Sequence, residues 1–313
     1  MTGVQTCALP ISVDAVGNMF IGSGGPEQPN HFGKITRVNA SGNLVWSHVF
    51  TSTELRGLAI SADTIYAASF NENLIVRLSL DEQTLPSWGV VDSTANELIN
   101  PVGMTFDSAD NLYVTDYVSD GRTCRLHRIK DSVIQTSWAA NDLYPALGPD
   151  WCPTDISRDT SGRFYLANGK GHSILRMTVS GNSILTETLP ISNDVFAVPK
   201  SIVVAPDGRI IITELNQNRA RILREIAGEL TTDVTITDTG DVAAGLIGGP
   251  VGVAISGTHL FLTDDKSRVL KFTLGATSAQ FVSAFTSTTT GPIPVLLNHP
   301  ESLEIGQIGR AHV

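Results

Sequence analysis

The sequence of 313 residues predicts an all-β protein with the architecture of a six-bladed β-propeller. One pattern of short apolar strands and tight polar turns occurs six times and fills the chain, and no segment shows apolar residues at helical spacing. Equivalent positions in the six units lie 46, 47, 52, 46 and 50 residues apart, at Phe20, Tyr66, Tyr113, Tyr165, Ile211 and Phe261. A unit of this length has room for four strands, which is the content of one propeller blade.

Each unit is expected to run from an inner strand to an outer strand. The first strand is short and apolar, and in units two to six it begins near Arg56, Pro101, Pro153, Pro199 and Pro250. A turn rich in Asp, Ser and Gly leads to a second strand that alternates with period two. The third strand carries one basic residue in each unit: Arg37, Arg77, Arg128, Arg176, Arg224 and Lys271. The outer strand is expected to hold Trp46, Trp88 and Trp138, packed between blades.

The two ends of the chain do not fit the repeat. Residues 1–11 and 308–313 resemble translated sequencing adapters, so we expect an environmental (metagenomic) gene fragment in which residues 12–307 form one propeller domain. The first unit begins partway through an innermost strand, at Ser12, and the segment HPESLEI at 299–305 matches the start of such a strand. This segment either completes the first blade, which gives six blades and is the arrangement we favour, or opens a truncated seventh blade.

Charge and composition exclude several classes of partner. Acidic residues outnumber basic residues by 31 to 21, which argues against nucleic acid or an anionic membrane as the main partner. The longest apolar run, 242–255, contains four Gly and one Pro and is shorter than the ~20 residues of a membrane span. Only 17% of the residues are charged, which favours a β-rich, exported protein in the periplasm or outside the cell. We expect it to be a monomer.

Two cysteines lie in loops that the repeat places on adjacent blades. Cys124 follows the second strand of unit three, and Cys152 precedes the first strand of unit four. They form a disulfide if the compartment is oxidising and their Cα atoms lie within about 7 Å; otherwise they are unrelated thiols. A structural zinc site of four thiolates is excluded for two cysteines.

The repeat resembles a known family of propellers. The string NPVGMTFDSADNLYVTD at 100–116, followed by RLHRI at 125–129, is similar to NHL-repeat propellers. It also resembles the wider six-bladed group that contains the SMP-30/gluconolactonase lactonases and the TolB-like propellers. The resemblance covers nearly all of 12–307 and implies the architecture. It does not imply one function, because this fold hosts both enzymes and binding modules.

The lactonase branch implies a divalent metal at the mouth of the central channel. Its Glu, Asn and Asp ligands stand near the start of innermost strands, and the equivalent positions here hold Arg56, Val102, Thr154, Lys200, Val251 and Glu301. Glu301 is the one carboxylate among them, and Asp155 lies one residue out of register. Two cations at the mouth would repel Ca²⁺. We therefore expect no metal or other cofactor; the alternative is a lactonase or hydrolase of this type with a degenerate Ca²⁺ site.

Other polar residues are expected to be structural. The resemblance to streptogramin-lyase propellers rests on Glu214 in the string IITE, but the paired His is missing, so we expect an ordinary loop residue. The His residues are scattered singly. An acidic or amide residue ends the second strand in four units, at Asp116, Asn168, Glu214 and Asp264. Because this feature and the third-strand basic residue recur, we assign both to turn capping and loop hydrogen bonds.

The candidate binding residues line the channel mouth. They are Arg56, Trp151, Thr154, Asp155, Lys200 and Glu301. We expect Arg56 to pair with Glu301 and Asp155 to be the partner of Lys200, in a site that prefers an anion to a divalent cation. Trp151 offers a ring for a carbohydrate. The sequence thus favours a ligand-binding or protein-interaction scaffold without catalytic residues, whose partner is an unidentified protein or a small anionic or carbohydrate ligand.

Overall fold

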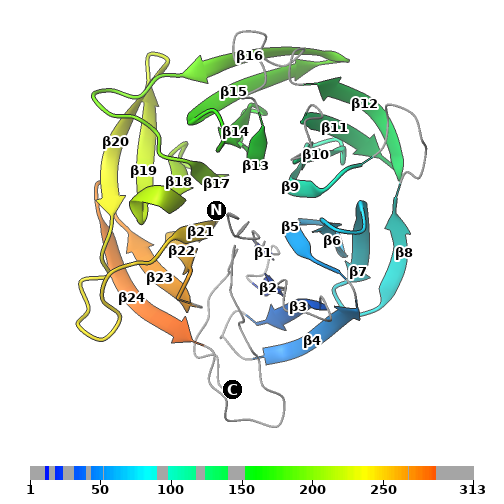
Figure 1. The fold of residues 1–313 in the computed structure, drawn as a ribbon, viewed down its shortest axis with the longest axis horizontal. Helices are drawn as coiled ribbons and strands as arrows, with labels where there is room; N and C mark the ends of the chain where they lie inside the picture. Colours follow the sequence, from blue (N-terminus) through cyan, green and yellow to red (C-terminus); the bar gives the residue numbers. More distant parts are fainter. Residues whose placement is uncertain are drawn as a thin grey trace, which may run out of the picture.

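A computed structural model shows six four-stranded antiparallel sheets arranged as the blades of a ring (Figure 1). It describes residues 11–13, 18–23, 32–39, 44–51, 53–89, 98–117, 124–139, 152–266 and 268–286. Every described strand belongs to one of these sheets, and the described helical structure is one short 3₁₀ turn, η2 (Leu215–Gln217). The predicted all-β, six-bladed architecture is confirmed.

The strands follow one another from the inside of each blade to the outside. Blade 1 contains β1 (Ile11–Val13), β2 (Met19–Ser23), β3 (Phe32–Val38) and β4 (Leu44–Thr51). Blade 2 contains β5 (Leu55–Ser61), β6 (Thr64–Ser69), β7 (Leu74–Ser79) and β8 (Thr84–Trp88). Blade 3 contains β9 (Pro101–Phe106), β10 (Leu112–Asp116), β11 (Arg125–Lys130) and β12 (Val133–Ala139).

The second half of the ring repeats this arrangement. Blade 4 contains β13 (Pro153–Arg158), β14 (Phe164–Asn168), β15 (Ser173–Ser180) and β16 (Ser183–Leu189). Blade 5 contains β17 (Pro199–Val204), β18 (Ile210–Glu214), β19 (Arg219–Ile226) and β20 (Glu229–Ile236). Blade 6 contains β21 (Pro250–Ser256), β22 (His259–Asp264), β23 (Arg268–Leu274) and β24 (Ala279–Thr286).

The innermost strands close the ring. Each contacts the innermost strand of the next blade, and β21 of blade 6 contacts β1 of blade 1. In the part of the chain that the structure describes, blades 6 and 1 are therefore direct neighbours, with no further blade between them. β1 starts at Ile11, which pairs with Ile21, one residue before the predicted start at Ser12. The predicted closing segment at 299–305 lies outside the described residues.

The core of the protein lies between the blades. Apolar side chains of one sheet pack against those of the next, because a single sheet cannot bury both of its faces alone. Between blades 3 and 4, for example, Tyr113 and Trp138 pack in one buried cluster with Phe164 and Met177. The three Trp residues expected in outer strands lie in β4, β8 and β12, and each ring neighbours an aromatic ring of the second strand in its own blade.

Three of the six basic residues of the third strands, Arg37, Arg128 and Arg176, contact the next blade, and the other three contact residues of their own blade. The Arg37 guanidinium of blade 1 donates to the Leu80 carbonyl of blade 2 at 2.6 Å. Arg128 of blade 3 donates to the Gly181 carbonyl of blade 4 at 2.5 Å. These carbonyls belong to turns near the outside of the neighbouring blade. The recurring cation therefore has the structural role expected from its recurrence.

Blades 3 and 4 are also joined covalently. Cys124, just before β11, forms a disulfide with Cys152, just before β13, with 5.2 Å between the Cα atoms. Both residues are buried, at 4% and 2% exposure, in the apolar cluster between the two blades. Among the described residues, no helix is long and apolar enough to cross a membrane.

Candidate binding face at the channel mouth

Two sets of loops meet at one end of the ring, which we call the mouth face. One set joins the second strand of a blade to its third strand. The other set leads from an outer strand to the innermost strand of the next blade (Figure 1). Among the candidate residues that the structure describes, Arg56, Thr154, Asp155 and Lys200 stand near the start of innermost strands. Trp151 and Glu301 lie outside the described residues.

In blades 3 to 6, the residue that ends the second strand holds the loop that leads into its blade. Asp116 accepts the Ile99 amide at 2.9 Å, and Asn168 accepts the Cys152 amide at 2.9 Å. The same contact recurs in blades 5 and 6, where Glu214 accepts from Ala197 at 2.7 Å and Asp264 from Gly248 at 3.1 Å. The recurring acidic or amide residue thus makes the loop hydrogen bond that its recurrence predicted.

The residue that ends a second strand faces a third-strand residue of complementary character: an arginine faces a carboxylate, and a serine faces the amide of blade 4. Arg219 lies 2.7 Å from Glu214, and Arg268 lies 2.5 Å from Asp264. In blade 4 the neutral Asn168 donates instead to the Ser173 hydroxyl at 3.1 Å. A buried carboxylate needs a cation or several donors, whereas a buried amide does not. The matched pairs therefore stabilise the fold and leave little capacity for a ligand.

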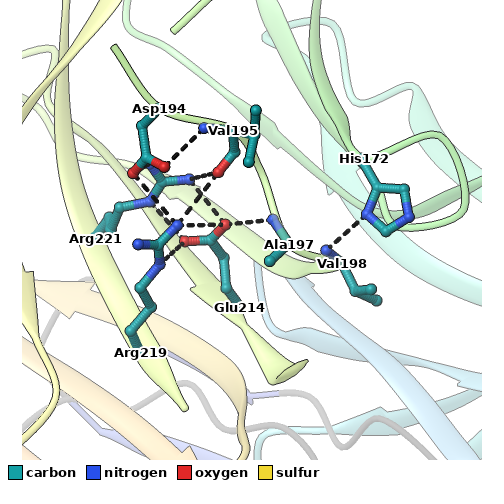
Figure 2. Close-up of polar contacts among 8 residues, drawn as sticks. All are labelled: His172, Asp194, Val195, Ala197, Val198, Glu214, Arg219 and Arg221. Atoms are coloured by element: carbon teal, nitrogen blue, oxygen red, sulfur yellow. Dashed lines mark hydrogen bonds and ion pairs between the residues drawn. The ribbon is translucent and has the colours of Figure 1, made fainter. Parts of the chain in front are cut away.

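The expectation for Glu214 was wrong. It is not an ordinary loop residue: its side chain is fully buried at the end of β18 and contacts two guanidinium groups. Arg221, also fully buried, lies 2.6 Å from Glu214 and 3.0 Å from Asp194, and its guanidinium stacks on Phe196 at 4.9 Å (Figure 2). Together these contacts fix the loop that leads into blade 5. The sequence pattern of an acidic residue followed by two Arg at 219 and 221 was the missed signal.

Blade 3 contains a second buried polar chain. His127 lies 2.7 Å from Asp116 through Nε2 and 2.7 Å from the Ser137 hydroxyl through Nδ1. The His127 side chain has no exposed surface. Burial raises the pKa of Asp116, and the contact with His127 opposes that shift. His127 and Arg221 occupy equivalent places in β11 and β19, and each contacts the buried carboxylate of its blade.

Arg56 is charge-compensated within its own blade. Its guanidinium lies 2.6 Å from the Glu54 carboxylate and 3.5 Å from the centre of the Phe70 ring. The residue is only 7% exposed. The pair with Glu301 that the sequence predicted lies outside the described residues and stays a prediction. Arg56 therefore contributes a stacked, neutralised cation to the wall of the mouth.

Asp155 joins three blades at the channel. It lies in β13 of blade 4, and its carboxylate accepts from the Ser201 hydroxyl at 2.6 Å and the Ile202 amide at 2.9 Å, both in blade 5. It also accepts the Ile156 amide at 2.8 Å. From blade 3, Gly103 approaches so closely that a Cβ there would lie 2.6 Å from the Asp155 Cα. Only glycine allows this approach.

The environment of Asp155 shifts its ionisation. Burial raises the pKa of this carboxyl to about 6, although the three hydrogen bonds and the positive charge of Lys200 act in the opposite direction. The predicted partnership of Asp155 with Lys200 stays a prediction. A strongly shifted carboxyl inside a channel is a feature of functional sites.

We expect Asp155 to make the folded state less stable as the pH rises. A carboxyl with a pKa of about 6 when folded and about 4 when unfolded holds its proton more tightly in the folded state. Its stabilising contribution is complete below pH 4 and is lost as the pH rises through 6, by roughly 2–3 kcal/mol. Urea unfolding of the protein and of Asp155→Asn at pH 4.5 and 7.5 checks this. The free energy of unfolding of the protein, relative to that of Asp155→Asn, should be lower at pH 7.5 than at pH 4.5. If it is not, the expectation is wrong.

Thr154 and the loop after β14 bring blades 4 and 5 together at the mouth. The Thr154 hydroxyl lies 3.1 Å from the Pro199 carbonyl, at the start of β17. A Cβ at Gly169 would lie 3.0 Å from the same carbonyl. Lys170 and Lys200 are the chain neighbours of these contacting residues, so both lysines stand at the boundary between blades 4 and 5.

Two contacts between blades at the mouth face were not predicted from the sequence. The amide of Asn100, just before β9, donates to the Asn73 side chain of blade 2 at 2.9 Å. The amide of Val198, just before β17, donates to Nδ1 of His172 in blade 4 at 3.1 Å (Figure 2). All four residues have positive φ, between 49° and 58°. For the β-branched Val198 this conformation costs about 1–3 kcal/mol, which the surrounding contacts must offset.

Oxygen ligands for a metal are not assembled in the part of the mouth that the structure describes. There, no three His, Cys, Asp or Glu side chains are grouped so that they could hold an ion. Three donors already occupy most of the acceptor positions of the Asp155 carboxylate, which leaves little capacity for Ca²⁺, an ion that takes six to eight oxygen ligands.

The fold is similar to several propellers of known structure, but no family model and no curated protein matches the sequence. Virginiamycin B lyase from Staphylococcus aureus matches with a TM-score of 0.60 and 16% identity, over 90% of this chain and 86% of that one. A streptogramin B lyase structure matches with a TM-score of 0.62 and 16% identity, over 99% and 90% of the two chains. A nidogen/laminin complex contains a chain that matches with a TM-score of 0.64 and 16% identity, over 93% and 98%. At this identity the likeness shows the fold alone.

Proposed function

We propose that this propeller is a binding scaffold that receives a small anionic ligand, bearing a carboxylate or phosphate, at the mouth face between blades 4 and 5. The observation that carries the proposal is the environment of Asp155. Its oxygens accept hydrogen bonds from three protein donors, so the negative charge is shared with these donors and the carboxylate is a poor metal ligand, while Lys200 adds a positive charge nearby. An anion is the ligand that this electrostatic environment favours.

Polar residues that are not part of the repeating pattern support this location. The acidic residues of the second strands and the basic residues of the third strands recur around the ring and serve the fold. Lys170, His172 and Lys200 do not belong to these recurring sets, and the contacts of Gly169 with Pro199 and of His172 with Val198 place their chain segments side by side. A ligand at this boundary would meet two ammonium groups and one imidazole, which are donors for carboxylate or phosphate oxygens.

The alternative is a metal-dependent lactonase with Ca²⁺ at the mouth. It would use Asp155 and Glu301 as ligands and would have to overcome repulsion from Arg56 and Lys200. We favour the binding scaffold because the hydrogen bonds of Asp155 are already satisfied. The buried disulfide supports our further proposal of a periplasmic or extracellular location, since such bonds persist in oxidising compartments.

Calorimetric titration with succinate and with inorganic phosphate at pH 7.5 tests the proposed function. We expect both to bind, and we expect Lys200→Ala to weaken binding at least fivefold because it removes a cation from the site. Lys130→Ala is the matched control: this exposed lysine lies at the opposite end of the ring, where its Nζ donates to the Ala109 carbonyl at 2.6 Å, and its loss should leave affinity unchanged.

The anion titration and a thermal-melting experiment with Ca²⁺ together distinguish the binding scaffold from the lactonase. Absence of binding by both anions, or equal loss in the two lysine variants, overturns the anionic-ligand proposal. A saturable rise of the melting temperature with Ca²⁺ that is lost in Glu301→Gln would favour the lactonase.

A further inference from the structure

The contact between His172 and Val198 differs from its counterpart in one chemical respect. Between blades 2 and 3 the acceptor is the Asn73 side-chain oxygen, which accepts a hydrogen bond at every pH. Between blades 4 and 5 the acceptor is Nδ1 of His172, which accepts only while it carries no proton. The two contacts are otherwise alike, because each acceptor stands four residues after the end of its second strand and each donor directly precedes a proline.

The segment that His172 holds is attached at both ends. Residues 194–198 lead from blade 4 into blade 5, and Glu214, Arg219 and Arg221 hold their first part through Asp194, the Val195 carbonyl and the Ala197 amide. His172 holds the last residue, Val198, from the opposite side (Figure 2). Val195 between these anchors is 73% exposed. Loss of the His172 contact would leave one end of the segment free to move and would relieve the positive φ of Val198.

We propose that His172 and Val198 form a pH-sensitive latch at the mouth face, closed when the imidazole is neutral and opened when it is protonated. Protonation turns Nδ1 into a donor, so that two N–H groups face each other and the contact breaks. Imidazole is the side chain whose charge ordinarily changes between pH 5 and 8. In the closed latch Nδ1 is an acceptor, so the ring proton is on Nε2, and opening adds one positive charge beside Lys170.

Other charged groups border the latch and must be distinguished from His172. They are Lys170 on the same loop, Lys200 and Asp155 beyond Pro199, and Asp194, Glu214, Arg219 and Arg221 at the far end of the segment. The Val195 amide and the two arginines hold the pKa of Asp194 below its usual range, so it stays ionised at pH 5.5. Burial raises the pKa of Asp155 to about 6, so its charge also changes between pH 7.5 and 5.5. A variant that removes only the imidazole separates the two groups.

Hydrogen–deuterium exchange at pH 7.5 and 5.5, corrected for the intrinsic exchange rate at each pH, tests the latch without any ligand. We expect protection of the Val198 amide to fall about fivefold at pH 5.5, the factor that a typical hydrogen bond contributes. His172→Asn copies the blade 2 contact and should keep this protection at both values. Conversely, Asn73→His should make protection of the Asn100 amide pH-dependent. Unchanged protection in the protein, or the same loss in His172→Asn, overturns the proposal.

A second measurement separates the latch from the proposed function, on which its role as a regulator rests. Sulfate keeps the same charge at both pH values, so its affinity reports on the protein alone. We measure it in the Asp155→Asn background, which removes the carboxyl that titrates near pH 6. There we expect sulfate to bind at least threefold more tightly at pH 5.5 than at 7.5, and equally at both once His172→Asn is added. If hydrogen exchange shows the latch but sulfate binds at neither pH, the latch is supported and the proposed anionic ligand is refuted. If sulfate binds with the same affinity at both pH values, regulation by the latch is refuted.

Discussion

Glu214→Gln is expected to destabilise the fold by about 3–5 kcal/mol, because it leaves buried guanidinium charge without its counter-ion. Glu214 is fully buried and lies 2.7 Å from Arg219 and 2.6 Å from Arg221. Arg221 has no exposed surface and keeps only the part-exposed Asp194 as an ionic partner. Glutamine is nearly isosteric, so the loss reports on charge and hydrogen bonding and not on packing. Urea unfolding at pH 7.5 measures it.

Glu187→Gln is the matched control for this substitution. Glu187 also pairs with an arginine, at 2.5 Å from Arg176, but its side chain is 53% exposed. An exposed pair contributes at most about 1 kcal/mol. If the two substitutions destabilise the protein equally, or if Glu214→Gln costs less than about 1 kcal/mol, the cluster does not anchor the blade 5 loop as described.

Removal of the disulfide is expected to destabilise the protein by roughly 3–4 kcal/mol. The bond joins residues 28 apart in sequence, and closing a loop of this length in the unfolded chain accounts for about 3.6 kcal/mol in the chain-entropy model. Substitution of both Cys124 and Cys152 by alanine also removes two buried sulfur atoms from the core between blades 3 and 4. Thermal and urea unfolding of the double variant under oxidising conditions measures the effect.

Reduction of the native protein provides the control. A thiol reductant should lower the stability of the native protein towards that of the double alanine variant and should leave the variant unchanged. A native protein whose unfolding does not respond to reduction under conditions that expose the bond would show that the disulfide contributes nothing to stability.

Features that recur in the sequence could be predicted well. The strand and turn pattern specified the blades because alternation, turn residues and repeat length are local signals. Recurrence also gave the role of Asp264 and Arg128 correctly, since a residue required by every blade serves the blade. The same reasoning placed Asp155 and Lys200 at the start of adjacent innermost strands, β13 and β17.

Features that depend on two loops from different blades could not be predicted in the same way. Glu214 was misjudged because the two nearby arginines were overlooked, and because the loop at 194–198 that covers it is not linked to it by a local pattern. His172 was interpreted as an isolated histidine because its partner is the backbone amide of Val198. Nearly every residue has such an amide, so the sequence does not indicate which one His172 contacts. The positive φ of Val198 is likewise imposed by tertiary contacts, since its own side chain and the following proline disfavour it.

The central claim is that the mouth face between blades 4 and 5 binds anions. Hydrogen–deuterium exchange with and without saturating inorganic phosphate at pH 7.5 tests it most directly, because it locates the ligand on the chain. The account predicts added protection in residues 169–172 and 198–202, and none in the turns at 107–111 and 206–209 at the opposite end of the ring. Protection confined to those turns, or to a different part of the mouth face, would contradict it.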